Sequence, residues 1–322
     1  MRLPRLLARA LRPVSRGLVA ALALLLLALA LPRWNLPQDS WDTVVVFDIT
    51  QSMNVEDYEL DGRNVSRLDF ARAAARRALR ELPCGSRVGW AAFAEYRTLL
   101  LVSPVEVCEH YGDLVAALDN IDGRMRWGNA SEIAKGVYWA VRTARAEASH
   151  PDIVFLTDGH EAPPVKGNGP APFDDARGGE IHGWILGVGG DAARPIPRTD
   201  DDGQRIGFWR AEDVIQMEAD PGAAPGSASA EQLSGLHEPH LRFLARQVGF
   251  DYARLDTAGA LARAIADPRL ARRVQVPTDL SWLPAGAALA LLLVRLWPYG
   301  APPWRQWLAR LRNGRGALNA PA

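Results

Sequence analysis

Short apolar runs and longer amphipathic stretches alternate along most of this chain. β-Branched apolar runs predict buried strands at residues 43–47, 152–156 and 181–188, with a shorter strand at 252–255. Apolar positions three and four residues apart predict helices over residues 67–82, 105–121, 132–148, 239–248 and 258–265. Strands that alternate with helices are typical of an α/β fold built on a parallel sheet.

One pair of apolar runs differs from this alternation. Residues 87–103 hold two runs separated by Glu95, Tyr96 and Arg97, which predicts an antiparallel hairpin. Pairing about that turn brings Cys84 and Cys108 together at the open end of the hairpin. A disulfide there fits an oxidising compartment, and two free, half-buried thiols are the alternative.

The remaining segments are polar or rich in turn-forming residues. Loops are predicted at residues 48–64 and 163–179. Residues 195–209 form an excursion with a small hairpin around Asp201, Asp202 and Gly203, and residues 219–230 have the composition of a flexible insert.

Composition adds one global constraint and one local asymmetry. The chain has 322 residues, enough for one large domain with appendages, and its 37 Lys and Arg balance 37 Asp and Glu. This balance gives no indication of a nucleic-acid partner. Residues 1–16 and 280–322 are rich in arginine and contain no acidic residue.

Each basic segment adjoins an apolar run, which predicts two membrane helices at residues 17–33 and 280–298. The positive-inside rule then places the tails 1–16 and 299–322 in the cytoplasm and residues 34–279 on the other side of the membrane. Two alternatives stay open. Ala28, Leu29 and Ala30 offer a cleavage site, so the first run is also compatible with a signal peptide, and the second is short enough for a buried core helix.

Candidate chemistry gathers where predicted strands end. Asp48, Thr50 and Ser52 follow the first strand, Asp158 follows the strand at 152–156, and Ser131 precedes a helix. Ligands of parallel sheets bind at the carboxyl ends of strands, so these oxygens are expected to form one site. They suit a hard divalent cation, with Mg²⁺ favoured and Mn²⁺ or Ca²⁺ as alternatives. Helix capping, including an N-cap role for Ser131, is the competing interpretation.

These motifs resemble the metal-ion-dependent adhesion site of von Willebrand factor A domains over about residues 41–268. The family's first loop is D-x-S-x-S, so Thr50 and Ser131 depart from it while keeping a hydroxyl. The resemblance implies a doubly wound, mostly parallel sheet with one antiparallel edge strand. It also implies a protein that is not an enzyme and binds a partner's Asp or Glu through the metal, with Glu161 and Asn129 at the rim of the partner groove.

Longer strings at residues 48–55, 103–108 and 157–164 are similar to inner-membrane A-domain proteins encoded with bacterial methanol dehydrogenase. That resemblance implies a periplasmic domain on the bacterial inner membrane that assists maturation of, and calcium insertion into, methanol dehydrogenase. A general envelope protein that acts with a MoxR-type AAA+ ATPase on another client is the alternative. A metal-dependent hydrolase is more remote, because haloacid-dehalogenase phosphatases need an acid where Thr50 stands.

Overall fold

The computed structural model describes residues 13–164, 181–215 and 230–296. The chain divides into two units. Residues 37–275 form one, called the α/β unit below, and residues 1–36 with 276–322 form the other, called the helical unit.

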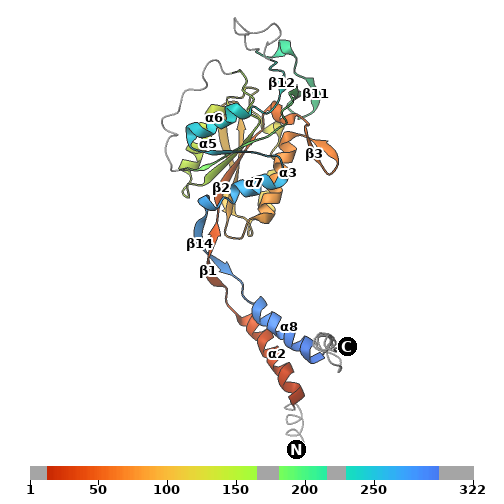
Figure 1. Ribbon diagram of the computed structural model, residues 1–322, viewed down its shortest axis with the longest axis vertical. Helices are drawn as coiled ribbons and strands as arrows, with labels where there is room; N and C mark the ends of the chain where they lie inside the picture. Colours follow the sequence, from red (N-terminus) through yellow and green to blue (C-terminus); the bar gives the residue numbers. More distant parts are fainter. Residues whose placement is uncertain (1–12, 165–180, 216–229, 297–322) are drawn as a thin grey trace, which may run out of the picture. The chain divides into compact units, whose positions relative to one another are not determined.

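The α/β unit is built on a six-stranded sheet (Figure 1). Its strands, in spatial order, are β13 (Asp251–Arg254), β8 (Gly183–Gly187), β7 (Asp152–Thr157), β2 (Asp42–Asp48), β5 (Arg87–Ala94) and β6 (Arg97–Glu106). Only β6, at one edge, runs antiparallel to its neighbour. Every residue of β2 and β7 is buried, as expected for apolar strands covered on both faces. The predicted mostly parallel sheet with one antiparallel edge strand is confirmed.

Helices cover both faces of this sheet (Figure 1). On one face lie α3 (Arg67–Glu81), α4 (Tyr111–Asp119) and α7 (Ala258–Ile265), and on the other lie α5 (Ile133–Ala146) and α6 (Glu238–Val248). Alternate β2 residues enter the two cores: Val45 and Phe47 pack in the first, Val44 and Val46 in the second. Ser66 caps α3 by accepting a hydrogen bond from the Asp69 amide, 3.0 Å away.

The β5–β6 hairpin has the predicted register near its turn, where Ala94 faces Arg97. The structure joins Cys84 and Cys108 in a disulfide at the open end, with 5.3 Å between their Cα atoms. The predicted helix at residues 105–121 is wrong at its start, because β6 continues to Glu106 and α4 begins only at Tyr111. Pro104 is compatible with this strand because β6 lies at the sheet edge, where a missing N–H breaks no ladder.

Two predicted loops contain small elements. The loop at 48–64 includes the 3₁₀ helix η1 (Gln51–Asn54) and the hairpin of β3 (Tyr58–Leu60) with β4 (Arg63–Val65). The excursion contains β10 (Pro197–Thr199) and β11 (Arg205–Phe208), which form the predicted hairpin. It is preceded by β9 (Arg194–Pro195), which pairs with β12 (Leu233–Ser234), and followed by η4 (Ala211–Asp213). Among the described residues, the other 3₁₀ turns are η2 (Gly123–Met125) and η5 (Pro268–Leu270). Residues 219–229 of the predicted insert and residues 165–179 of the predicted loop lie outside the described residues.

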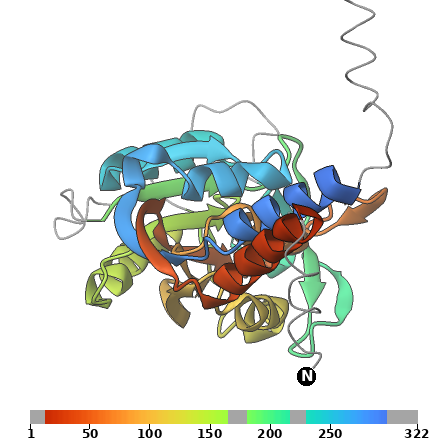
Figure 2. The ribbon, with the colours of Figure 1, turned by 90° about the horizontal axis from the view of Figure 1, so that it is seen from below.

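The helical unit contains α2 (Pro13–Ala30) and α8 (Trp282–Leu296), which lie side by side (Figure 2) with Ala21 and Ala288 buried. No helix in the described part of the chain has both the length and the apolar character needed to cross a bilayer. The membrane helices predicted at 17–33 and 280–298 overlap α2 and α8 but are not confirmed. A two-stranded sheet of β1 (Trp34–Ser40) and β14 (Arg272–Thr278) was not predicted from the sequence.

Candidate metal centre

The candidate site residues lie where the strand order of the sheet reverses. The chain passes from β2 to β5 on one side and returns to β7 on the other side of β2. Because β2 and β7 pair in parallel, with Phe47 facing Leu156, the residues that follow each strand lie next to each other. This is the position at which open α/β sheets bind ligands.

Asp48 lies in a shell made of hydroxyl groups. The Thr50 amide and hydroxyl donate to Asp48 Oδ1 at 2.9 and 2.6 Å, and the Thr157 hydroxyl donates to Oδ2 at 2.6 Å. The Thr50 hydroxyl is also 3.2 Å from that of Ser52. The first loop therefore gathers one carboxylate and two hydroxyls, as the spacing of Asp48, Thr50 and Ser52 predicts.

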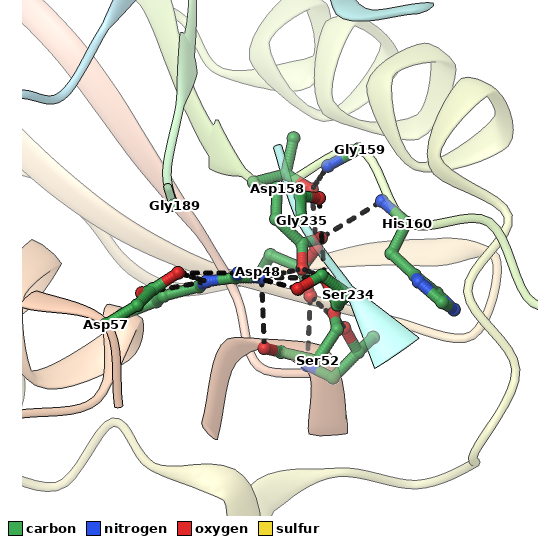
Figure 3. Close-up of polar contacts among 12 residues, drawn as sticks. Asp48, Ser52, Asp57, Asp158, Gly159, His160, Gly189, Ser234 and Gly235 are labelled. Atoms are coloured by element: carbon green, nitrogen blue, oxygen red, sulfur yellow. Dashed lines mark hydrogen bonds and ion pairs between the residues drawn. The ribbon is translucent and has the colours of Figure 1, made fainter. Parts of the chain in front are cut away.

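Asp158 lies in a different shell, in which a buried arginine is the main partner. Figure 3 shows Ser234 and His160 beside the Asp158 carboxylate. Arg67 Nη1 and the Ser234 hydroxyl each lie 2.7 Å from Asp158 Oδ2, and the His160 amide donates to Oδ1 at 3.0 Å. The rest of the guanidinium is held by Asp57, with Nη2 2.7 Å from Oδ2. The side chains of Arg67 and Asp158 are both fully buried, so this ion pair is inaccessible to solvent.

The glycine that follows β8 makes room for this arginine. A Cβ atom added to Gly189 would lie 2.9 Å from Arg67 Cζ, and its φ of +129° is in a region that other residues rarely adopt. The Gly189 amide donates to the Tyr58 hydroxyl at 2.9 Å, which fixes this backbone beside the buried pair.

The two carboxylates consequently have opposite protonation tendencies. Burial, and then the charge of Asp158, raise the pKa of Asp48 to about 7 despite its hydrogen bonds from Thr157 and Thr50. Burial acts in the same direction on Asp158, but the Arg67 charge, followed by His160 and Ser234, outweighs it and lowers the pKa of this carboxyl. The site thus combines one carboxyl whose ionised form is stabilised, Asp158, with one whose protonated form is stabilised, Asp48.

Ser131 is the third part of the predicted ligand set. It precedes α5, but the N-cap position belongs to Glu132, so the predicted capping role of Ser131 is wrong. Its backbone instead exchanges hydrogen bonds with Ala162, at 2.7 and 2.8 Å. Its hydroxyl is buried and has no hydrogen-bond partner within the described residues. Such groups are rare and call for a specific explanation.

The two residues predicted at the partner rim both line one cavity with the hydroxyl residues. Asn129 and Glu161 border a space of about 250 Å³ together with Thr50, Ser52 and Ser131. Glu161 also has a structural role, because its carboxylate accepts from the Ile133 amide at 3.0 Å and lies 2.9 Å from His240 Nε2. It supplies the cap for α5 that Ser131 does not.

Five residues that were not predicted as ligands hold the site together: Arg67, Asp57, Thr157, Ser234 and Gln51. One signal existed for Arg67, which lies on the same helical face as Ala71, Ala74 and Ala78 and is the charged member of an otherwise apolar stripe. No signal marks Ser234, because it reaches the site only through β12, far along the chain.

The donor set fits a hard divalent cation. All five predicted ligands offer oxygen. The unpartnered hydroxyl belongs to Ser131, which lines the same cavity as Thr50, and the Thr50 hydroxyl donates to the Asp48 carboxyl. Three or more His, Cys, Asp or Glu side chains that lie close together could also share an ion. In the described residues one such group is found, made of Cys84, Glu106 and Cys108. The disulfide occupies both of those sulfurs.

Comparison with known proteins supports the fold. Residues 43–160, less than half of the chain, match the family described as von Willebrand factor type A domain. Together with the sheet order, this match assigns the von Willebrand factor A fold to the α/β unit. No curated protein matches the chain.

Two solved structures are similar to this chain. One is the conserved hypothetical protein BatB from Bacteroides thetaiotaomicron, with 19% identity and a TM-score of 0.50 over 70% of this chain and 95% of that one. The other is an aerotolerance-related membrane protein from Bacteroides fragilis with multiple mutations to serines, at 19% identity and a TM-score of 0.50 over 70% and 96%. At this identity the similarity establishes the fold alone.

Proposed function

We propose that the α/β unit binds one divalent cation at the carboxyl ends of β2 and β7 and uses it to hold an acidic side chain of a protein partner. The observation that carries the proposal is the Ser131 hydroxyl, which is buried without a partner among the described residues and belongs to a residue lining the same cavity as Thr50 and Ser52. A bound cation would satisfy this oxygen.

The residues divide into two roles. The hydroxyls of Thr50, Ser52 and Ser131 would contact the cation, while Asp48 and Asp158 balance its charge. Asp158 is already engaged by Arg67 and Ser234, which favours its acting through water. When bound, the cation supplies an electrophilic position that a partner's carboxylate can fill. Mg²⁺ is the preferred ion because it keeps exchangeable waters, and Mn²⁺ and Ca²⁺ are the alternatives.

Calorimetric titration of the full chain with Mg²⁺, Mn²⁺ and Ca²⁺ tests the metal site. We expect one equivalent to bind the wild type and none to bind Asp48→Ala. Glu59→Ala is the matched control, because Glu59 is an exposed acid of the same loop and should leave binding unchanged. Absence of binding by the wild type, or equal binding by Asp48→Ala, would refute the proposed site.

We further propose that the helical unit attaches the protein to the bacterial inner membrane, with the α/β unit in the periplasm and both termini in the cytoplasm. Leucines of α2 are unusually exposed for a water-soluble surface, with Leu29 at 86% and Leu22 at 58%. The similar Bacteroides fragilis protein is described as a membrane protein. Alkaline phosphatase fused after residue 279 should be active if the proposed orientation holds.

The client proposed from the resemblance of residues 48–55 and 157–164 is methanol dehydrogenase during its maturation and calcium insertion. The apoenzyme should then co-purify with the full chain in Mg²⁺ and dissociate in chelator, and Asp48→Ala should not retain it. Retention of a MoxR-type ATPase, without the apoenzyme, would instead favour the general envelope role.

A further inference from the structure

The excursion between β8 and α6 supplies apolar residues to the cavity at the candidate metal centre. The cavity of about 250 Å³ is lined by Thr50, Ser52 and Ser131, by Ile196 and Trp209 of the excursion, and by Val214 and Ile215, which follow the excursion. Pro163 and Pro164 add further apolar surface. The hydroxyl set and a mainly apolar surface therefore share one space.

This apolar surface is fixed to the metal loop through Gln51, the residue between Thr50 and Ser52. Gln51 Oε1 accepts hydrogen bonds from Trp209 Nε1 at 2.9 Å and from the Thr199 amide at 3.1 Å. Its Nε2 donates to Asn129 Oδ1 at 3.1 Å. Gln51 is itself buried, so the position of the Trp209 indole is set by the same backbone that presents the hydroxyls.

The charges around the cavity show what can enter it. The ionisable residues among its described lining are His160, Glu161, Asp213 and Glu231, and none of that lining is lysine or arginine. Two arginines contact the lining without belonging to it: Arg198 lies over the Trp209 ring and pairs with Asp213, and Arg126 donates to Asn129. Because the ionisable residues of the lining itself are mainly acidic, a bound metal would supply the main attraction for an incoming carboxylate. The rest of the lining is mainly apolar, so burying an apolar side chain of the partner against it would contribute favourable binding free energy.

The size of the cavity limits the kind of ligand that it can hold. About 250 Å³ is below the range of roughly 300–1,000 Å³ that holds drug-sized ligands, so the space suits side chains rather than a separate small molecule. An acidic residue and a neighbouring apolar residue of one chain would together reach both parts of the lining.

We infer that this cavity is a specificity pocket for a protein partner that presents an Asp or Glu within two positions of a bulky apolar side chain. The carboxylate would bind the metal, and the apolar side chain would contact Trp209, Ile196 and Ile215. The inference rests on the proposed function but goes beyond it, because the excursion would determine which acidic partners bind.

A peptide display library tests the inference on the full chain in lipid nanodiscs, with binding in Mg²⁺ and elution by chelator. We expect enrichment of sequences that combine an acid with a nearby Leu, Ile, Phe or Trp. Replacing that apolar residue by Ala in a synthetic peptide should weaken binding at least about tenfold. Peptides selected by the Trp209→Ala variant should still contain the acidic residue but should no longer be enriched in a nearby apolar residue.

Two further variants separate pocket effects from folding effects. Ile215→Ser changes a lining residue that is 69% exposed, so it should weaken the apolar preference without disturbing the fold. Trp127→Ala is the control, because Trp127 is 40% exposed and is not among the lining residues.

Each outcome decides something different. Acid enrichment without any apolar preference would overturn the inference and leave the proposed function standing. Apolar enrichment that needs neither an acid nor Mg²⁺ would overturn the proposed function, and with it the metal-linked form of the inference. A library that yields no Mg²⁺-dependent binders would contradict the inference, while the calorimetric titration would still report on the metal separately.

Discussion

Asp48 and Asp158 are equally buried at the same edge of one sheet, yet their surroundings differ in kind. Hydroxyls and one amide surround the first, and a buried guanidinium holds the second. The pKa of Asp48 is raised to about 7 while that of Asp158 is lowered. The comparison teaches that depth alone does not set the charge of a carboxyl. A nearby charge decides the direction: Arg67 outweighs burial at Asp158, whereas burial and the charge of Asp158 outweigh the hydrogen bonds at Asp48.

The largest expected effect comes from removing the arginine that makes the difference. Arg67→Met leaves Asp57 and Asp158 buried without a cation and should lower the free energy of unfolding by about 3–5 kcal/mol. Urea unfolding of the full chain measures this. Arg72→Met on the same helix is the control: its pair with Asp69 is partly exposed and should contribute at most about 1 kcal/mol. Equal effects would show that the buried pair is not the stabilising feature.

Neutral isosteres of the two aspartates should separate their roles. Asp158→Asn removes the negative charge that Arg67 and Ser234 contact. Because the interactions of this buried charge are weakened, the free energy of unfolding should fall by about 2–3 kcal/mol. Asp48→Asn should instead raise the free energy of unfolding at pH 7 without metal, because it removes a carboxyl that the unfolded chain ionises more readily than the folded state does. Unfolding in chelator compares the two variants. A larger loss for Asp48→Asn would reverse the assignment.

The pH dependence of stability sharpens the same contrast. Below the ordinary pKa of 3.8, Asp48 is protonated in the folded and unfolded states, and its contribution to stability is fully present. As pH rises from there towards about 7, the unfolded chain releases this proton first, so the metal-free fold loses up to about 1.4 kcal/mol per pH unit. Mg²⁺ should offset the loss, and Asp48→Asn should remove this component. Unfolding at several pH values, with chelator or Mg²⁺, measures both.

The smallest effects should come from two serines that differ only in their partners. Ser131→Ala removes a hydroxyl with no partner in the described residues, so stability should stay within about 0.5 kcal/mol while Mg²⁺ affinity falls about tenfold. Ser234→Ala removes a hydroxyl bonded to Asp158 and Arg67 and should lower stability by about 1 kcal/mol with little change in affinity. Unfolding experiments and calorimetry on both variants test whether Ser131→Ala affects mainly Mg²⁺ affinity and Ser234→Ala mainly stability. Similar profiles for both variants would contradict it.

The sequence by itself determined the α/β order, the antiparallel edge strand and the carboxylates after β2 and β7. These follow from local periodicity and from the rule that strand ends of a parallel sheet share an edge, so a short window around Asp48 or Asp158 carries the information. It also indicated the proximity of Cys84 and Cys108 from the hairpin register. It did not determine where β6 ends, because Val105 fits an edge strand as well as a helix face.

Only the tertiary structure decided how the two aspartates differ. Arg67 and Ser234 reach Asp158 from α3 and β12, separated from it by 91 and 76 positions along the chain. Trp209 donates a hydrogen bond to Gln51 in the loop after β2, and the two residues are 158 positions apart along the chain. No local pattern encodes such contacts, because a buried charge acquires its partner only when distant elements pack together. Sequence therefore located the oxygens, and packing set their charges and the pocket beside them.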